Sequence, residues 1–276
     1  MDNTVALLLV GAALGLVLGL LGGGGGILAV PLLVAVGEPV LVASTMSLVI
    51  VGSGAGAALV PHHRAQRVDW PVGLTFGGLG AVGAILGARI AQVLTPAMLL
   101  AGLGVLLVFG SYTMLRTAAR ARRHAMVEAQ PQLTMAGGAL APDLVPATGS
   151  WTSSTSSRVR VVALASGVGL VTGLFGVGAG FVVVPALVSA MKLPVKKATA
   201  TGLVVIVINS AVALAARHSS MTGIGLTLAL AATSAVFAVL GALVSRRIPG
   251  WVLSAAFGAL MVLVAVYTLF KALSGS

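Results

Sequence analysis

Eight long segments of this chain carry almost no charge and are apolar over most of their length. They cover residues 5–36, 39–60, 71–94, 97–115, 160–190, 194–216, 223–245 and 250–272. A helix rises about 1.5 Å per residue, so about 20 apolar residues cross a hydrocarbon core of about 30 Å. Only 8% of the residues are charged, whereas soluble domains average about 25%. We therefore predict an all-α fold, a polytopic transmembrane helical bundle in contact with the lipid bilayer, and place it in a bacterial-type plasma membrane.

The remaining polar residues exclude several classes of function. The chain has no cysteine, which excludes disulfides, thiolate metal sites and cysteine nucleophiles. Its net charge of +11 arises between the apolar segments, which is typical of a topology signal and not of nucleic-acid binding. The acids Asp2, Glu38, Asp69, Glu128 and Asp143 all lie near segment ends or in loops, so a proton pump built on a buried carboxylate is not expected. The histidines and hydroxyls form no recognisable metal or triad arrangement, and we expect no metal, no cofactor and no enzymatic activity.

The two halves of the chain resemble each other at a nearly constant offset. GLLGGGGGILAVP at 19–31 matches GLFGVGAGFVVVP at 173–185, and ASTMSL at 43–48 matches ATATGL at 198–203. The offset between matching positions stays at 154 to 155 residues. Unrelated apolar helices would not preserve such a spacing, so we infer two homologous halves, as in many secondary transporters.

The stretch between the two halves has a different composition. It opens with four arginines and continues with Ala, Pro, Gly and Ser, without an apolar run that could bury a core. Such a composition is typical of a linker. We therefore divide the chain into a first transmembrane repeat at 1–115, a cytoplasmic linker at 116–159 and a second transmembrane repeat at 160–276.

A glycine-rich stretch interrupts the first apolar segment of each half. Residues 5–36 are longer than one crossing requires, and five consecutive glycines lie inside them. Glycine costs about 1 kcal/mol relative to alanine in a helix, so we expect the helix to break there and the chain to fold back. The alternatives are close helix packing through small residues and one long tilted helix. Irregular backbone at membrane depth survives only inside a protein or beside a water-filled cavity.

The basic residues indicate how the segments are oriented. If 5–36 and 160–190 each return to their starting side, thirteen of the sixteen Lys and Arg share one side of the membrane, and Arg89, Arg217 and Lys271 lie on the other. If every segment simply crosses, the division is ten to six. The sharper asymmetry favours the folded-back arrangement, with the basic side cytoplasmic. Each half then makes three net crossings, so we predict that the second half is inverted relative to the first.

Broken helices of this kind provide backbone that can bind anions. Half-helices that begin after Gly26 and Gly180 would point unpaired N–H groups and a partial positive charge at the breaks. Hydroxyls near the next helices could add donors, although helix back-bonding or capping explains them equally well. Asn209 could line a pathway or make an interhelical hydrogen bond. The predicted substrate-binding residues are Gly22, Gly23, Gly24, Gly25, Gly26, Ser44, Thr45, Ser47, Gly176, Gly178, Gly180, Thr199, Thr201 and Asn209.

With its paired motifs GLLGGGGGILAVPLLV and GLFGVGAGFVVVPALV, each followed by a proline-containing turn and a small Ser/Thr stretch, the chain resembles the sulfite exporter TauE/SafE family of membrane permeases. The resemblance covers nearly the whole chain except 116–159. It implies transport of sulfite, organosulfonates or related small anions, with the glycine-rich breaks as the substrate region. The second break reads GVGAG and not all glycine, which argues against a symmetric site.

From the residues and the resemblance we expect a secondary transporter that exports a small anion such as sulfite or an organosulfonate by alternating access. The closest alternative is a passive anion channel. A non-transporting interaction or sensor protein and an intramembrane enzyme that acts on lipid are further alternatives. The expected partners are the small anionic substrate and the bilayer, without nucleic acid, and a homo-oligomer is left open.

Overall fold

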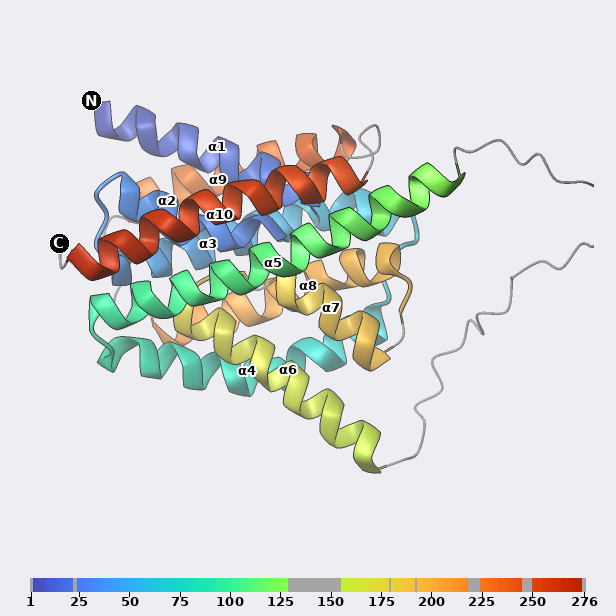
Figure 1. Cartoon of the computed structure of the whole chain (residues 1–276). Coiled ribbons are helices and arrows are strands. Elements are labelled where there is room, and N and C mark those ends of the chain that lie inside the picture. The colour runs from blue at the N-terminus through green and yellow to red at the C-terminus, as the bar shows by residue number, and fades with distance from the viewer. Residues whose placement is uncertain are drawn as a thin grey trace, which may run out of the picture.

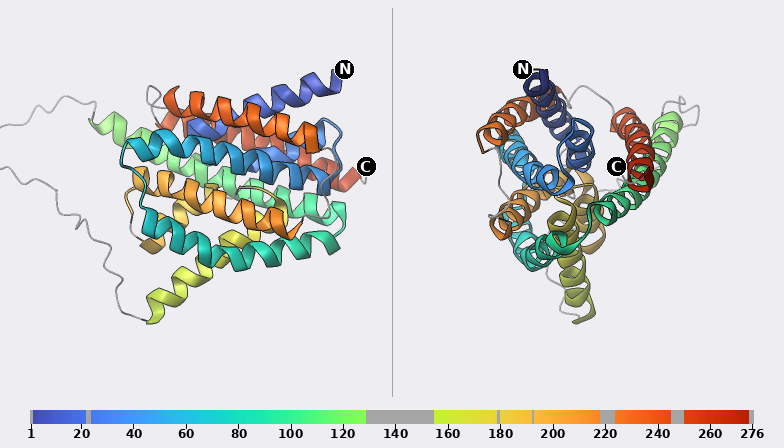
Figure 2. Two further views of the ribbon diagram at one scale, coloured as in Figure 1. Left: turned by 180° about the vertical axis from the view of Figure 1, so that it is seen from behind. Right: turned by 90° about the vertical axis from the view of Figure 1, so that its left-hand side faces the viewer.

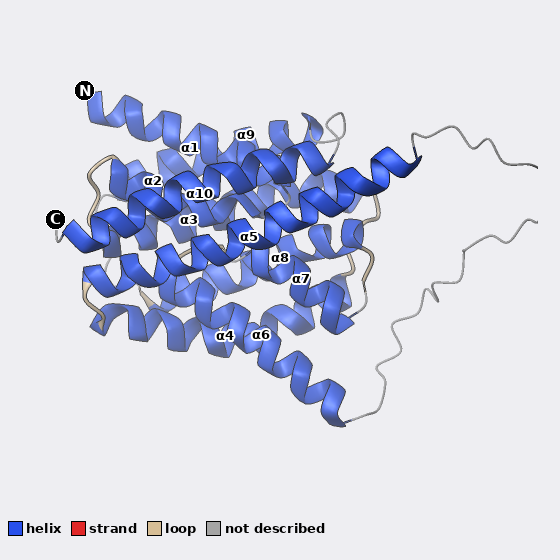
Figure 3. Ribbon diagram, viewed as in Figure 1, coloured by secondary structure: helices blue, strands red, loops and turns tan. Residues whose placement is uncertain are grey.

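A computed structural model describes residues 2–21, 24–128, 155–178, 180–191, 193–217, 224–244 and 250–274, and all structural statements below concern these residues. Within them the regular elements are all helices (Figure 3). The first half contains α1 (Asp2–Leu21), the short 3-10 helix η1 (Gly24–Leu28), α2 (Ala29–Ala35), α3 (Val40–Arg64), α4 (Trp70–Val93) and α5 (Pro96–Glu128). The second half contains α6 (Thr155–Phe175), α7 (Gly180–Met191), α8 (Val195–Ala216), α9 (Ile224–Val244) and α10 (Gly250–Ser274). The predicted all-α class is confirmed.

Four of these helices are long and apolar enough to cross a membrane, namely α3, α4 and the parts of α8 and α9 at Lys197–Ala216 and Thr227–Val244. Large apolar side chains also cover the outer surface of the bundle. Phe109 is 59% exposed, Leu263 67% and Phe270 71%. Such a surface would be unfavourable in water and is favourable against lipid, so the structure is that of an integral membrane protein.

Proline and aspartate define where several helices begin. Pro39 precedes α3 with φ −57° and ψ 143°, and Pro194 precedes α8 with φ −56° and ψ 141°. The near-identical geometry follows from the fixed φ of proline at matching positions of the two halves. Asp69 caps α4, because its carboxylate accepts a hydrogen bond of 3.3 Å from the backbone N–H of Val72.

The helices of the two halves are interleaved in the bundle. α3 and α8 pack against each other, α1 packs along α9, α6 packs along α4, and α5 pairs with α10. Viewed along the bundle, the α5–α10 pair stands at one side (Figure 2). Each half therefore packs its first helix against a membrane-spanning helix of the other half, α9 or α4.

Two matching glycines make this interleaving possible. A Cβ atom on Gly19 would lie 2.0 Å from the carbonyl oxygen of Ala238, and one on Gly173 would lie 2.1 Å from the carbonyl oxygen of Ala84. Gly19 and Gly173 occupy matching positions, and so do Ala84 and Ala238. Only glycine permits such close approach of two helices, which explains why these positions are glycine in both halves.

Both chain termini lie at one end of the bundle, whereas the end of α5 and the start of α6 lie at the opposite end (Figure 1). The helix α5 continues to Glu128 and α6 begins at Thr155, so both ends of the predicted linker are helical. Residues 116–128 are rich in Ala and Arg, which are strong helix formers, and they extend α5 beyond its apolar part. The remainder of the linker, 129–154, lies outside the described residues.

Candidate functional site

Both predicted helix breaks are present in the structure. In the first half, α1 ends at Leu21, and after the break a Cβ atom on Gly25 would lie only 2.6 Å from the backbone nitrogen of Leu18. The chain therefore folds back along α1, and a single long tilted helix is excluded. In the second half, α6 ends at Phe175, residues 176–178 are not helical, and α7 starts at Gly180.

The half-helices start at different points from those expected. The predicted helix after Gly26 begins at Ala29, because Gly24–Leu28 form the tighter 3-10 helix η1. Runs of glycine lose too much backbone entropy to continue an α-helix, which accounts for the short irregular element. Gly180 is itself the first residue of α7 and does not precede it. The predicted site residues Gly22 and Gly23 lie outside the described residues.

The two breaks contact each other inside the bundle, beside α3. A Cβ atom on Gly26 would lie 3.2 Å from the backbone nitrogen of Gly178 and 3.0 Å from Cγ1 of Val51. One on Gly178 would lie 2.1 Å from the same Val51 methyl group. Gly25, Gly26 and Gly178 are all buried. Glycine backbone from both halves therefore meets at one buried point.

The second break is also anchored to α3. The hydroxyl of Ser47 donates a buried hydrogen bond of 2.7 Å to the carbonyl oxygen of Gly176. Gly176 has φ +68°, and a Cβ atom there would lie 2.1 Å from the carbonyl oxygen of Ser44. Both the left-handed backbone and the lack of space require glycine at this position.

The other predicted hydroxyls have partners of their own. Ser44 and Thr45 each donate to the carbonyl oxygen of Leu41, at 3.1 and 2.9 Å, which is the back-bonding geometry within a helix. Thr201 Oγ1 accepts a hydrogen bond of 3.0 Å from the backbone N–H of Asp69. Thr199 is partly buried in the first turns of α8. Ser47 thus bonds directly to a glycine break.

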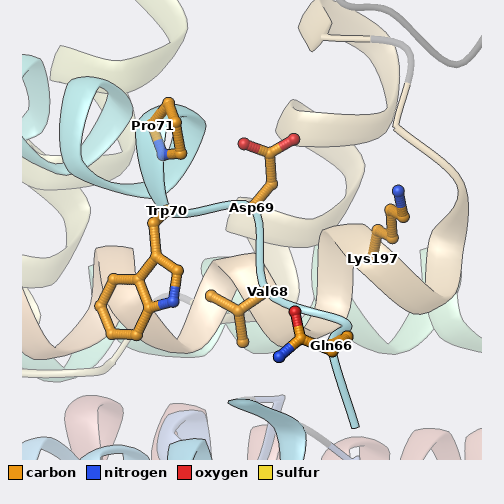
Figure 4. Close-up of a pocket in the computed structure, with 6 residues that line it drawn as sticks. All are labelled: Gln66, Val68, Asp69, Trp70, Pro71 and Lys197. Carbon is orange, nitrogen blue, oxygen red and sulfur yellow. The ribbon is translucent and has the colours of Figure 1, made fainter. Parts of the chain in front are cut away.

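A pocket of about 220 Å³ lies at the turn between α3 and α4 (Figure 4). Its lining residues are Gln66, Val68, Asp69, Trp70, Pro71 and Lys197. In this view the side chains of Asp69 and Lys197 extend in a similar direction, with their charged groups apart. Since Thr201 bonds to Asp69, its hydroxyl supports this turn at the ends of the helices.

Asn209 lies completely buried in α8, and neither its amide nitrogen nor its amide oxygen has a hydrogen-bond partner among the described residues. The amide faces Gly80 of α4, where a Cβ atom would lie 2.8 Å from its oxygen. The neighbouring hydroxyl of Ser210 is also buried without a partner. Unpaired buried amides are costly at membrane depth, so a polar group at this position calls for a ligand or water.

Arg217 is the functional candidate that sequence reasoning missed. It lies one residue beyond the α8 membrane span and is completely buried. Its Nη1 donates to the hydroxyl of Ser44, and its Nη2 donates to the carbonyl oxygens of Gly173 and Leu174, the latter at 3.0 Å. Burial lowers the pKa of Arg217 to about 10, so the guanidinium remains charged at neutral pH. From the sequence it counted only as one of three basic residues on the sparsely charged side.

The comparisons with known proteins agree with this architecture. The family model described as "Sulfite exporter TauE/SafE" matches residues 7–268. The chain belongs to the sulfite exporter TauE/SafE family. This confirms the resemblance inferred from the paired glycine motifs, and it assigns the chain to membrane transporters and not to enzymes.

Three similar proteins are described as probable membrane transporters. A "Probable membrane transporter protein" of Xylella fastidiosa (strain 9a5c) is 33% identical over 202 residues, which cover 71% of this chain and 67% of that protein. Its counterpart in Xylella fastidiosa (strain Temecula1 / ATCC 700964) is 35% identical over the same shares of each chain. The "Probable membrane transporter protein YunE" of Bacillus subtilis (strain 168) is 27% identical over 75% of both chains. No solved structure matches the chain.

Proposed function

We propose that this TauE/SafE protein is a secondary transporter that exports a small anion, such as sulfite or an organosulfonate, across a bacterial-type plasma membrane by alternating access. Membership of the family establishes a membrane transporter. The observation that carries the finer proposal is the buried contact between Gly26 and Gly178, where irregular backbone from both halves meets. The proposed substrate site comprises these breaks together with Ser47 and Asn209, and the remaining predicted hydroxyls stay candidates.

The chemistry of this region favours an anion. Glycine has no side chain that shields its backbone N–H group, and α7 begins at the second break, where the first N–H groups of a helix have no partner within that helix and carry a partial positive charge. Where the structure describes the surroundings of an acidic side chain, the residues are Glu38 and Asp69. They lie in the turns that precede α3 and α4. A cation would find no compensating charge at the breaks, whereas an anion would find donors.

An inverted relation of the two halves would supply the alternating mechanism. Both termini lie at one end, and the end of α5 and the start of α6 lie at the other (Figure 1), as three net crossings per half require. The exchange of partners, with α1 on α9 and α6 on α4, is the pattern expected for a two-fold relation. Rocking of one hairpin against the other around fixed breaks would then expose the site to each side in turn.

The membrane potential could drive export of an anion without a buried acid. An inside-negative potential contributes about 2.3 kcal/mol per unit charge per 100 mV in the outward direction. A mechanism of this kind is consistent with the lack of acids in the apolar segments.

Flux through reconstituted protein tests the proposal. Proteoliposomes loaded with radiolabelled sulfite or methanesulfonate should release the label at a rate that saturates with concentration, and unlabelled anion outside should accelerate the exchange. Saturable counterflow excludes a passive channel, since a channel does not couple the two directions. Deletion of residues 125–150 should leave this flux intact; its loss with normal folding would favour an interaction or sensor protein instead.

A further inference from the structure

Arg217 holds a charge inside the protein that no carboxylate compensates among the described residues. Its three acceptors are the Ser44 hydroxyl and the carbonyl oxygens of Gly173 and Leu174, all of them neutral. Its Nε–H is buried and has no acceptor within the part of the chain that the structure describes. Burial of a charge without a counter-charge is unfavourable, and a buried guanidinium is normally matched by a carboxylate or phosphate.

The open donor has a defined direction. In a guanidinium, Nε–H and one N–H of Nη2 point to the same side and together form the fork that binds an oxyanion with two parallel hydrogen bonds. In Arg217 this side is half used, since Nη2 donates to backbone carbonyls and Nε donates to nothing. An anion could accept a hydrogen bond from Nε–H without displacing another acceptor, and it would compete with the neutral carbonyls for the N–H groups of Nη2.

We propose that Arg217 binds the oxyanion group of the transported molecule through Nε and Nη2. This inference rests on the proposed function, to which it adds the residue that supplies the positive charge for the sulfite or sulfonate group. Two oxygens of such a group can accept the two parallel N–H donors of the fork, whereas a halide offers a single spherical acceptor.

Binding at Arg217 would also act on the second hairpin. The guanidinium joins the last turn of α6 to Ser44 of α3, and Ser44 packs directly against Gly176 in the break. When an anion replaces the carbonyls as acceptor for Nη2, the tip of the hairpin loses one of its ties to α3. The same residue therefore couples recognition to release of the hairpin.

A purely structural role is the competing explanation, since an arginine that donates to the last carbonyls of a helix also caps that helix. The two roles differ in what they require of the ligand. A cap is indifferent to anions, whereas a binding residue makes affinity depend on the charge and on the fork.

The test compares Arg217→Gln and Arg217→Lys with a matched control, Arg89→Gln, which removes the same charge from an exposed position on α4. Each purified variant is titrated with methanesulfonate and with dimethyl sulfone, a neutral molecule of similar shape, and binding is read from the shift in thermal unfolding. Labelled sulfite efflux is measured in parallel. We expect the wild type and Arg89→Gln to bind methanesulfonate alike and to ignore the sulfone, whereas Arg217→Gln loses at least about tenfold in affinity and flux.

Arg217→Lys keeps the charge and a capping donor but loses the fork, so its affinity for methanesulfonate should fall while its unfolding temperature without ligand stays close to that of the wild type. This variant decides the matter if Arg217→Gln does not fold. Unchanged affinity in a folded Arg217 variant would overturn the inference and leave the proposed function standing. Absence of anion binding and flux in the wild type would overturn both.

Discussion

The hydroxyl of Ser47 donates a hydrogen bond of 2.7 Å to the carbonyl oxygen of Gly176, and this bond ties a membrane helix of the first half to the glycine break of the second. Close by, Gly178 packs against Val51 of the same helix and against Gly26 of the first break. Helix α3 is therefore the element on which both hairpins converge.

Gly176→Ala should destabilise the folded protein strongly. The substitution places a side chain at φ +68° and drives its Cβ to within 2.1 Å of the Ser44 carbonyl oxygen. We expect a loss of at least about 2 kcal/mol in the free energy of unfolding. The control is Gly167→Ala in α6, where a Cβ meets nothing within 4 Å. There the better helix propensity of alanine should raise the free energy of unfolding by up to about 1 kcal/mol. Thermal unfolding in detergent measures both, and equal stability of the two variants would contradict the structure at this break.

Gly178→Ala should be rescued by a second substitution. The added Cβ would lie 2.1 Å from Cγ1 of Val51, a branched side chain with little freedom to move away. We expect Gly178→Ala to cost about 1–3 kcal/mol and Gly178→Ala with Val51→Ala to recover a large part of it. A double-mutant cycle on unfolding temperatures gives the coupling, and strictly additive effects would show that the two residues do not touch.

Asn209→Ala separates transport from stability. The amide has no hydrogen bond to lose among the residues with a described structure, so the free energy of unfolding should stay within about 1 kcal/mol of the wild type. If Asn209 contacts the anion, as proposed, the rate of sulfite efflux should fall about tenfold or more. Normal efflux from this variant would remove Asn209 from the substrate site and leave its unpaired amide to a buried water.

The orientation of the halves can be measured by cysteine labelling, because the chain has no cysteine of its own. Glu38 precedes α3, and Lys197 lies in the first turn of α8, the matching helix of the second half. Single cysteines at Glu38 and Lys197 should react with a membrane-impermeant maleimide from opposite sides, with Lys197→Cys protected until the cytoplasmic side is opened. Labelling of both from the same side in intact cells would reject the inverted arrangement.

Much of the fold could be predicted from hydropathy and glycine. Six of the eight apolar segments correspond to one helix each, because backbone in lipid must satisfy its own hydrogen bonds, and the other two, 5–36 and 160–190, each hold two α-helices separated by a break. The breaks followed from the weak helix propensity of the glycine runs. Matching starts of α3 and α8 followed from Pro39 and Pro194.

The contacts of polar side chains could not be predicted in the same way. For Thr201 the sequence left ligand contact and helix capping or back-bonding open, and its hydroxyl accepts from the backbone of Asp69, a partner in a distant turn. Arg217 follows an apolar helix, and in the sequence such an arginine is indistinguishable from one that reaches the interface. Its burial depends on carbonyls at the end of α6 and on Ser44, which only the packing of three helices brings together.

The position of a bound anion is the most direct test of the proposal that the two glycine breaks form the substrate site. Selenite has the shape of sulfite and scatters anomalously, so crystals of the protein grown with selenite, at a concentration that saturates its competition with sulfite efflux, would locate the site. If the two breaks form the substrate site, an anomalous peak will lie inside the bundle, in contact with their backbone around Gly26 and Gly178. Peaks found only at the protein surface or at the pocket beside Asp69 and Lys197, in protein that competes for selenite, would contradict it.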